Sequence, residues 1–175
     1  MLKVTTPAQR PSCWSSGRSP GSRRARRRPP LPSWRASAWL DGNDSDRFAT
    51  ALVVHIDVPT RTATVASAGH LAPALLSPTP TGTVPSALEL ETGPPLGIGQ
   101  EWHDRSTQLP ADAVLFLFTD GLVETRVDDI DEGVRRLGEL LEGLPFDART
   151  ILHSALELHP GEDEDDVAVL VAHVP

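Results

Sequence analysis

AVLFLFTDG, residues 113–121, joins six consecutive apolar residues to a turn sequence. An apolar run this short, with Pro110 before it and Gly121 after it, is typical of a strand buried on both faces. We therefore expect a central strand over residues 113–118. Asp120 follows this strand, so its carboxylate should lie at the rim of the sheet, where Gly121 allows a sharp turn.

A second acidic stretch has the reverse order near the C-terminus. The run EDEDD, residues 162–166, leads directly into the apolar residues 167–171. If the two strands are antiparallel neighbours, Asp120 at the end of one lies beside Asp165 and Asp166 at the start of the other. Carboxylates brought together in this way outline a site for a hard cation, because such cations prefer oxygen ligands.

Charge divides the 175 residues into two unlike parts. The first 40 residues hold nine basic and no acidic side chains, whereas the remainder holds seven basic and all 24 acidic ones, a net charge of −17. We expect residues 1–40 to be a disordered segment rich in Arg, Pro and Ser, and residues 41–175 to form the domain. A domain this acidic repels nucleic acid and favours cations, metal ions above all.

The basic segment leaves several interpretations open. The arginines between Arg23 and Arg28 could form an arm for nucleic acid or an acidic membrane, or a solvated tail without a partner. A misplaced start of the reading frame would also explain the abrupt change in composition near Asp41. The only cysteine, Cys13, indicates a reducing compartment, and no apolar run approaches the roughly 20 residues of a membrane span. These features predict a soluble, cytoplasmic protein.

Hydrophobic periodicity predicts an α+β fold. Strands are expected at 48–56 and 62–68 as a hairpin, at 74–76, 88–90 and 102–109, and at both apolar runs described above, with loops at 77–85 and 93–99. The period changes to 3.6 after Gly121, which predicts a helix over 131–144 and a second helix capped by Asp147. An antiparallel meander, two helices and a returning strand differ from the regular alternation of a parallel α/β fold.

Five short motifs resemble those of metal-dependent (PPM, type 2C) Ser/Thr protein phosphatases, in the same order. The resemblance is to the bacterial sporulation-phosphatase and sigma-factor-regulator branch. The motifs are RFATAL at 47–52, AGH at 68–70, GPPLG at 93–97, LFTDGLVE at 117–124 and DDVAVL at 165–170. Each motif is short, but five in order between residues 47 and 170 are specific.

The resemblance implies an αββα sandwich with a binuclear Mn²⁺ or Mg²⁺ site at the rim between two sheets. Asp120 and Asp165 match two of the family's metal-binding aspartates, and Gly121 and Asp166 match supporting positions. In such enzymes the metals activate a bridging water that attacks phosphorus. The implied substrates are phosphoserine or phosphothreonine proteins, typically anti-sigma-factor antagonists.

The sequence also departs from the family's pattern. Neither a Gly-Gly-Asp motif nor an Asp-x-Ser-Gly-His-Gly motif occurs, and these supply the metal-bridging aspartate and a carbonyl ligand in the family. The expectation is therefore a partial phosphatase domain that is either active or a non-catalytic module binding a phosphoprotein. His70 could contact phosphate or donate a proton, or it could simply bond to the neighbouring turn.

Overall fold

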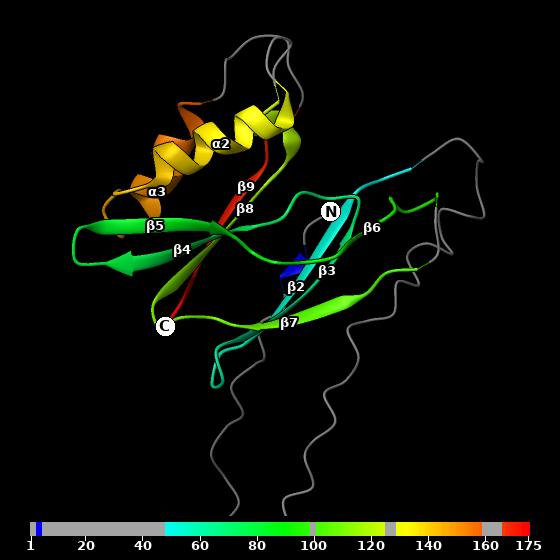
Figure 1. The fold of residues 1–175 in the computed structure, drawn as a ribbon, viewed down its shortest axis with the longest axis horizontal. Coiled ribbons are helices and arrows are strands. Elements are labelled where there is room, and N and C mark those ends of the chain that lie inside the picture. Colours follow the sequence, from blue (N-terminus) through cyan, green and yellow to red (C-terminus); the bar gives the residue numbers. More distant parts are fainter. Residues whose placement is uncertain (1–2, 5–47, 99–100, 125–128, 159–165) are drawn as a thin grey trace, which may run out of the picture.

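The computed structural model describes residues 3–4, 48–98, 101–124, 129–158 and 166–175. Two mostly antiparallel sheets lie against each other, and two helices cover the outer face of one of them (Figure 1). The described residues therefore form three layers, in the order sheet, sheet and helices. This arrangement confirms the expected α+β class and corresponds to a partial αββα sandwich.

The elements follow one another in a simple order. They are β1 (Lys3–Val4), β2 (Ala51–Asp57), β3 (Thr62–Ala68), β4 (Ala74–Thr79), β5 (Gly82–Ala87), β6 (Thr92–Gly93), β7 (Asp104–Gln108), β8 (Ala113–Phe118), the short 3₁₀ helix η1 (Asp120–Leu122), α2 (Ile130–Leu141), α3 (Ala148–Leu156) and β9 (Val169–Val174).

The first sheet is built around the β2–β3 hairpin. All seven residues of β2 pair with β3, and the other edge of β3 pairs antiparallel with β7 and parallel with β6. The two residues of β1 pair in parallel with Val53 and Val54 of β2. One face of this hairpin, including Leu52, Val54 and Val65, packs into the core between the sheets.

The second sheet has the strand order β5-β4-β8-β9, and β8 lies inside it. All six residues of β8 are buried. Ala113, Leu115 and Leu117 face the first sheet, whereas Val114 and Phe116 face the helices. Because both faces of the strand are covered, its sequence is an unbroken apolar run without alternation.

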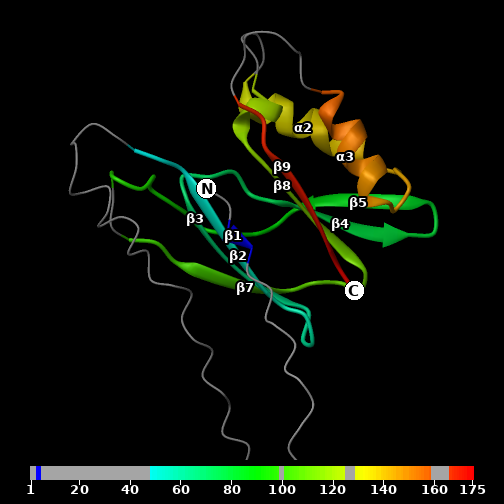
Figure 2. The same ribbon diagram turned by 180° about the vertical axis from the view of Figure 1, so that it is seen from behind.

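The helices cover the second sheet through apolar faces and begin at acidic caps. Figure 2 shows α2 and α3 from behind, lying over the sheet that contains β8 and β9. Asp129 and Asp147 precede α2 and α3, and each carboxylate accepts a bond from a backbone N–H of the first turn, that of Glu132 at 2.9 Å and that of Thr150 at 2.8 Å. The expected cap at Asp147 is therefore confirmed.

The expected loop at 77–85 is wrong, because β4 and β5 form a hairpin there. The prolines that suggested a loop lie at positions where the missing backbone N–H removes no hydrogen bond to β8. Pro78 lies beyond the three residues of β4 that pair with β8, and Pro85 belongs to the edge strand β5. The strand expected at 88–90 is also wrong, since β5 ends at Ala87 and Leu88 is buried outside any strand.

Helix α2 contains two glycines in contrasting surroundings. A Cβ on Gly133 would lie 1.9 Å from the carbonyl oxygen of Val123, the residue that follows η1. A Cβ on Gly138 would meet nothing within 4 Å. Gly133 therefore permits the close packing of α2 against the chain that leaves β8.

We predict that these glycines respond oppositely to alanine. Gly133→Ala should lower the free energy of unfolding by about 1–3 kcal/mol, because the added methyl group meets backbone. Gly138→Ala should raise it by up to about 1 kcal/mol, because alanine favours the helix and finds open space. Urea unfolding of both variants beside the unchanged chain measures the difference. Equal effects would contradict the close packing at Gly133.

Candidate active site at the rim between the sheets

The candidate site begins where β8 ends. Residues 120–122 form η1, so the chain turns immediately after the strand. The Asp120 carbonyl accepts bonds from the N–H groups of Val123 and Glu124, both at 2.8 Å, which fixes the turn. Gly121 is buried in this turn and is not among the residues with positive φ, so the turn needs no left-handed backbone there.

The Asp120 side chain is half-buried and only partly engaged. Its Oδ1 accepts a hydrogen bond from the Gly121 N–H at 3.1 Å. Within the described residues no donor is bonded to Oδ2. A half-buried carboxylate with one oxygen that accepts no bond from the described residues is a suitable ligand for a hard cation.

The start of β9 lies beside this turn. β8 and β9 are antiparallel neighbours, and their last pair at this end is Phe118 with Val169. Thr119 continues the contact by bonding to Ala168 and to Asp166. The exposed Asp166 therefore lies at the same rim as Asp120, whereas Asp165 lies outside the described residues.

His70 reaches the rim from the other sheet. It follows β3, and its backbone is held by the buried Ser67, whose Oγ donates to the His70 carbonyl at 2.8 Å and accepts from its N–H at 3.1 Å. Its ring Nδ1 lies 3.3 Å from the Thr50 hydroxyl. Gly69, at φ +66°, makes the turn possible, and a Cβ there would lie 2.7 Å from Pro95.

The surroundings lower the pKa of His70 below its ordinary value. Partial burial is the largest cause, because it penalises the charged imidazolium. The negative charge of Asp120 acts in the opposite direction, as does interaction with the backbone of Phe118. The ring of His70 and the Asp120 carboxylate are thus close enough to influence each other electrostatically.

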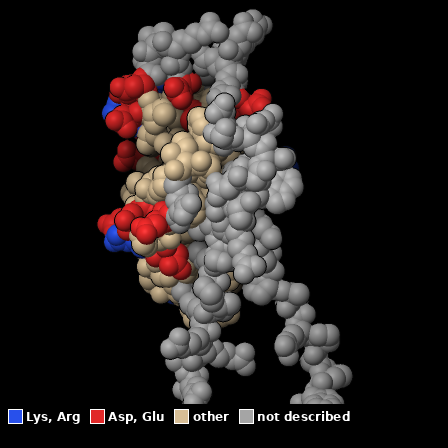
Figure 3. Space-filling model, turned by 90° about the vertical axis from the view of Figure 1, so that its right-hand side faces the viewer, with Lys and Arg blue, Asp and Glu red and all other residues tan. Residues whose placement is uncertain are grey.

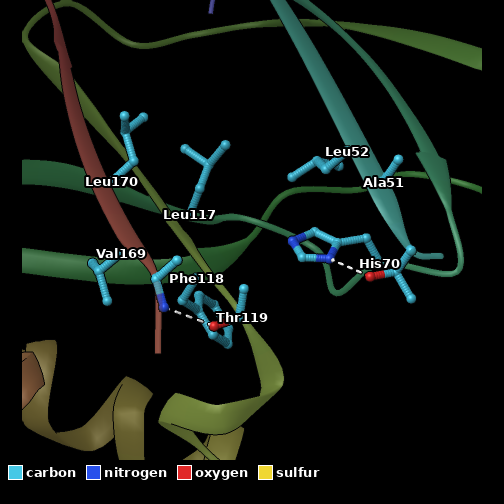
Figure 4. Close-up of a pocket in the computed structure, with 10 residues that line it drawn as sticks. Ala51, Leu52, His70, Leu117, Phe118, Thr119, Val169 and Leu170 are labelled. Atoms are coloured by element: carbon cyan, nitrogen blue, oxygen red, sulfur yellow. Dashed lines mark hydrogen bonds between the residues drawn. The ribbon is translucent and has the colours of Figure 1, made fainter. Parts of the chain in front are cut away.

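A cavity of about 300 Å³ opens between the two sheets at this rim. Figure 4 shows the His70 ring on one side of it and Thr119 on another, and Leu52, Leu117 and Leu170 also line it. Its lining is mainly apolar, and its polar atoms belong to the residues that fix the rim. The cavity therefore borders His70 and Thr119 but provides few hydrogen-bonding groups of its own.

No group of three or more His, Cys, Asp or Glu side chains able to hold a metal occurs among the described residues. Sequence reasoning named Asp120, Asp166 and His70, and the structure places all three at one rim. It gave no role to Ser67 or Thr119. Two features of the sequence could have indicated them. Ser67 is a polar residue in the buried strand β3, and Thr119 places a hydroxyl between the end of β8 and Asp120.

Comparison with known families identifies the chain. A family model described as Stage II sporulation protein E (SpoIIE) matches residues 35–175. The chain belongs to this family. The predicted resemblance to the sporulation and sigma-factor-regulator branch of type 2C phosphatases is thereby confirmed.

Solved structures show the same fold at low sequence identity. The SpoIIE phosphatase domain from Bacillus subtilis, Mn presoaked, is 17% identical with a TM-score of 0.51, over 89% of this chain and 79% of that one. RsbX in complex with magnesium is 19% identical with a TM-score of 0.56, over 80% of this chain and 63% of that one. The RsbU and RsbW domains of Rv1364c from Mycobacterium tuberculosis are 21% identical with a TM-score of 0.55, over 66% of this chain and 34% of that one. The SpoIIE-family chain thus spans only part of the last two proteins.

No curated protein sequence matches the chain. In the described parts of this SpoIIE-family chain, no helix combines the length and the apolar character that a membrane crossing requires.

We predict that the imidazole of His70 titrates below pH 6.5. Asp120→Asn should lower the pKa of His70 further, because the substitution removes the nearby negative charge that favours imidazolium. The unfolded chain then binds the proton before the folded one does, so His70 should reduce stability as the pH falls through 6.5. NMR titration of the His70 ring in both proteins measures the shift. An unchanged midpoint in Asp120→Asn would place the two groups farther apart than the structure does.

Proposed function

We propose that the chain contributes to a metal-dependent phosphoserine or phosphothreonine protein phosphatase of bacterial signalling. The observation that carries the proposal is the position of Asp120, which a buried strand delivers to the rim between two sheets in a chain of the SpoIIE family. His70 and Asp166 lie at the same rim. Among the described residues no donor bonds to the Asp120 Oδ2, and a cavity lined by His70 opens at this rim.

A divalent cation, Mn²⁺ or Mg²⁺, fits this proposal in part. Asp120 would be a ligand, Asp165 would be a second one, and Asp166 would support the site. The related RsbX structure is a complex with magnesium, and one SpoIIE structure was presoaked with Mn. Such a cation takes about six oxygen ligands, so the carboxylates at the rim supply only a fraction of them. When bound, it lowers the pKa of a coordinated water and neutralises phosphate charge.

The residues of the chain would have distinct parts in the reaction. Asp120 would hold the cation through its carboxylate, which is oriented by the Gly121 N–H that donates to Oδ1. His70 stays neutral near pH 7 because burial lowers its pKa, so one ring nitrogen can donate a hydrogen bond to a phosphate oxygen. Red areas exceed blue ones on the face that Figure 3 shows, and an acidic surface would repel phosphate unless a cation is present.

The proposed substrate is a phosphorylated protein that regulates a sigma factor, such as an anti-sigma-factor antagonist. The support is membership of the SpoIIE family and a fold shared with the RsbU and RsbX structures. The proposed compartment is the cytoplasm, where such regulators act.

A second function, from a different class, is a non-catalytic module that binds a phosphoprotein without turnover. It is favoured by the absence of the two metal-binding motifs named above from residues 1–175. With an incomplete ligand set, the rim would still present His70 and the cavity to a partner.

We predict that the purified chain hydrolyses p-nitrophenyl phosphate and a phosphoserine peptide only when Mn²⁺ is added. Asp120→Asn should reduce this rate by at least about 100-fold, because it removes a charged ligand. Asp112→Asn is the matched control, since Asp112 lies at the opposite end of β8 with φ +55°, which asparagine tolerates. Its rate should match that of the unchanged chain.

Two results would overturn the catalytic proposal. A folded chain that binds the phosphopeptide but never hydrolyses it would favour the binding module. Activity that survives Asp120→Asn would show that the reaction does not depend on this carboxylate.

A further inference from the structure

Thr119 occupies a special place in the pairing of β8 with β9. Its N–H donates to the Ala168 carbonyl at 3.0 Å, which extends the ladder by one residue beyond Phe118 and Val169. In a regular antiparallel ladder the Ala168 N–H would donate back to the Thr119 carbonyl. Here it donates to the Thr119 hydroxyl instead, at 2.9 Å (Figure 4).

The Thr119 carbonyl is used elsewhere. It accepts from the Leu122 N–H at 3.1 Å and so closes η1, the turn that carries Asp120. The hydroxyl therefore replaces the carbonyl in the ladder and frees it for the turn. One residue thus ends the strand and starts the turn without leaving the Ala168 N–H unpaired.

The same hydroxyl also reaches toward the acidic segment. Thr119 Oγ1 donates to the Asp166 carbonyl at 3.0 Å. A hydroxyl can accept one bond and donate another, as this one does between Ala168 and Asp166. Its two bonds hold the chain before β9 against the turn that holds Asp120.

We propose that Thr119 is a positioning residue: its hydroxyl holds the backbone of Asp166 beside the turn that carries Asp120, so that Asp166 can support a cation bound by Asp120. The inference rests on the proposed function, because this alignment matters for catalysis only if Asp120 binds a metal. Only serine and threonine offer a hydroxyl of this reach, and the branched Cβ of threonine also restricts its rotamer.

The test uses three variants of the full chain. Thr119→Val keeps the shape but removes the hydroxyl, and Thr119→Ser keeps the hydroxyl. Thr79→Val is the control, since the Thr79 hydroxyl also bonds a backbone carbonyl, that of Gly82 at 2.9 Å, but lies in the β4–β5 hairpin turn. Two quantities are measured at a temperature where every protein is folded: Mn²⁺ affinity by calorimetry, and hydrogen exchange and chemical shifts of backbone amides by NMR.

The expected result separates Thr119→Val from the other proteins. Its Mn²⁺ affinity should fall by about tenfold or more, as for residues that orient metal ligands, while Thr119→Ser and Thr79→Val bind like the unchanged chain. The Ala168 amide should exchange faster in Thr119→Val, and the amide signals of Asp120 and Asp166 should shift. Because every protein is folded at the chosen temperature, a general loss of stability would not by itself lower the Mn²⁺ affinity.

Two outcomes overturn the inference. Thr119→Val binding Mn²⁺ as tightly as the unchanged chain would do so directly. If the unchanged chain binds no Mn²⁺, the proposed function fails, and the NMR data alone decide whether Thr119 positions the two segments. Unchanged Ala168 exchange and unchanged Asp120 and Asp166 signals in Thr119→Val would then overturn the positioning role. Selective changes in these signals would support it.

Discussion

The antiparallel pairing of β8 with β9 is the constraint on which the rest of the structure depends. Six consecutive residue pairs, from Ala113 with Val174 to Phe118 with Val169, fix the register of two strands that are far apart in the sequence. A slip of one residue would turn the apolar side chains of β8 to the wrong faces and would separate Asp120 from the segment before β9. Burial of β8 on both faces therefore protects the geometry of the site as well as the core.

The site combines precise backbone positions with few charged groups. Ser67 holds His70 from one sheet, and Thr119 holds Asp166 from the other, in each case by a hydroxyl that both accepts and donates. Their hydrogen bonds satisfy buried or strand-end backbone groups, so the rim can be open to solvent without losing its shape. His70 lines the cavity, and the negative charge of Asp120 raises the pKa of the His70 ring against the larger lowering effect of burial.

Much of the architecture is predictable from the sequence because local patterns and burial agree. The β2–β3 hairpin, the central strand, the cap at Asp147 and the order of the helices all follow from periodicity and turn residues. The β4–β5 hairpin does not, because its prolines lie at positions whose tolerance depends on which strands pair with β4. The location of Asp120 and Asp166 at the same rim is predictable, since it needs only antiparallel neighbours. The exchange of a carbonyl for the Thr119 hydroxyl is not, because it depends on atomic geometry at one strand end.

Paramagnetic broadening of backbone amide signals by substoichiometric Mn²⁺ tests the central claim most directly, because a bound Mn²⁺ broadens the signals of nearby nuclei first. The account predicts that the amides of residues 119–121 and 166–168 lose intensity together, at Mn²⁺ concentrations that leave those of the β4–β5 turn unchanged. Both segments border the same rim, so one cation should affect both. Broadening confined to the acidic residues of α2, or spread evenly over the surface, would contradict a cation site at the paired ends of β8 and β9.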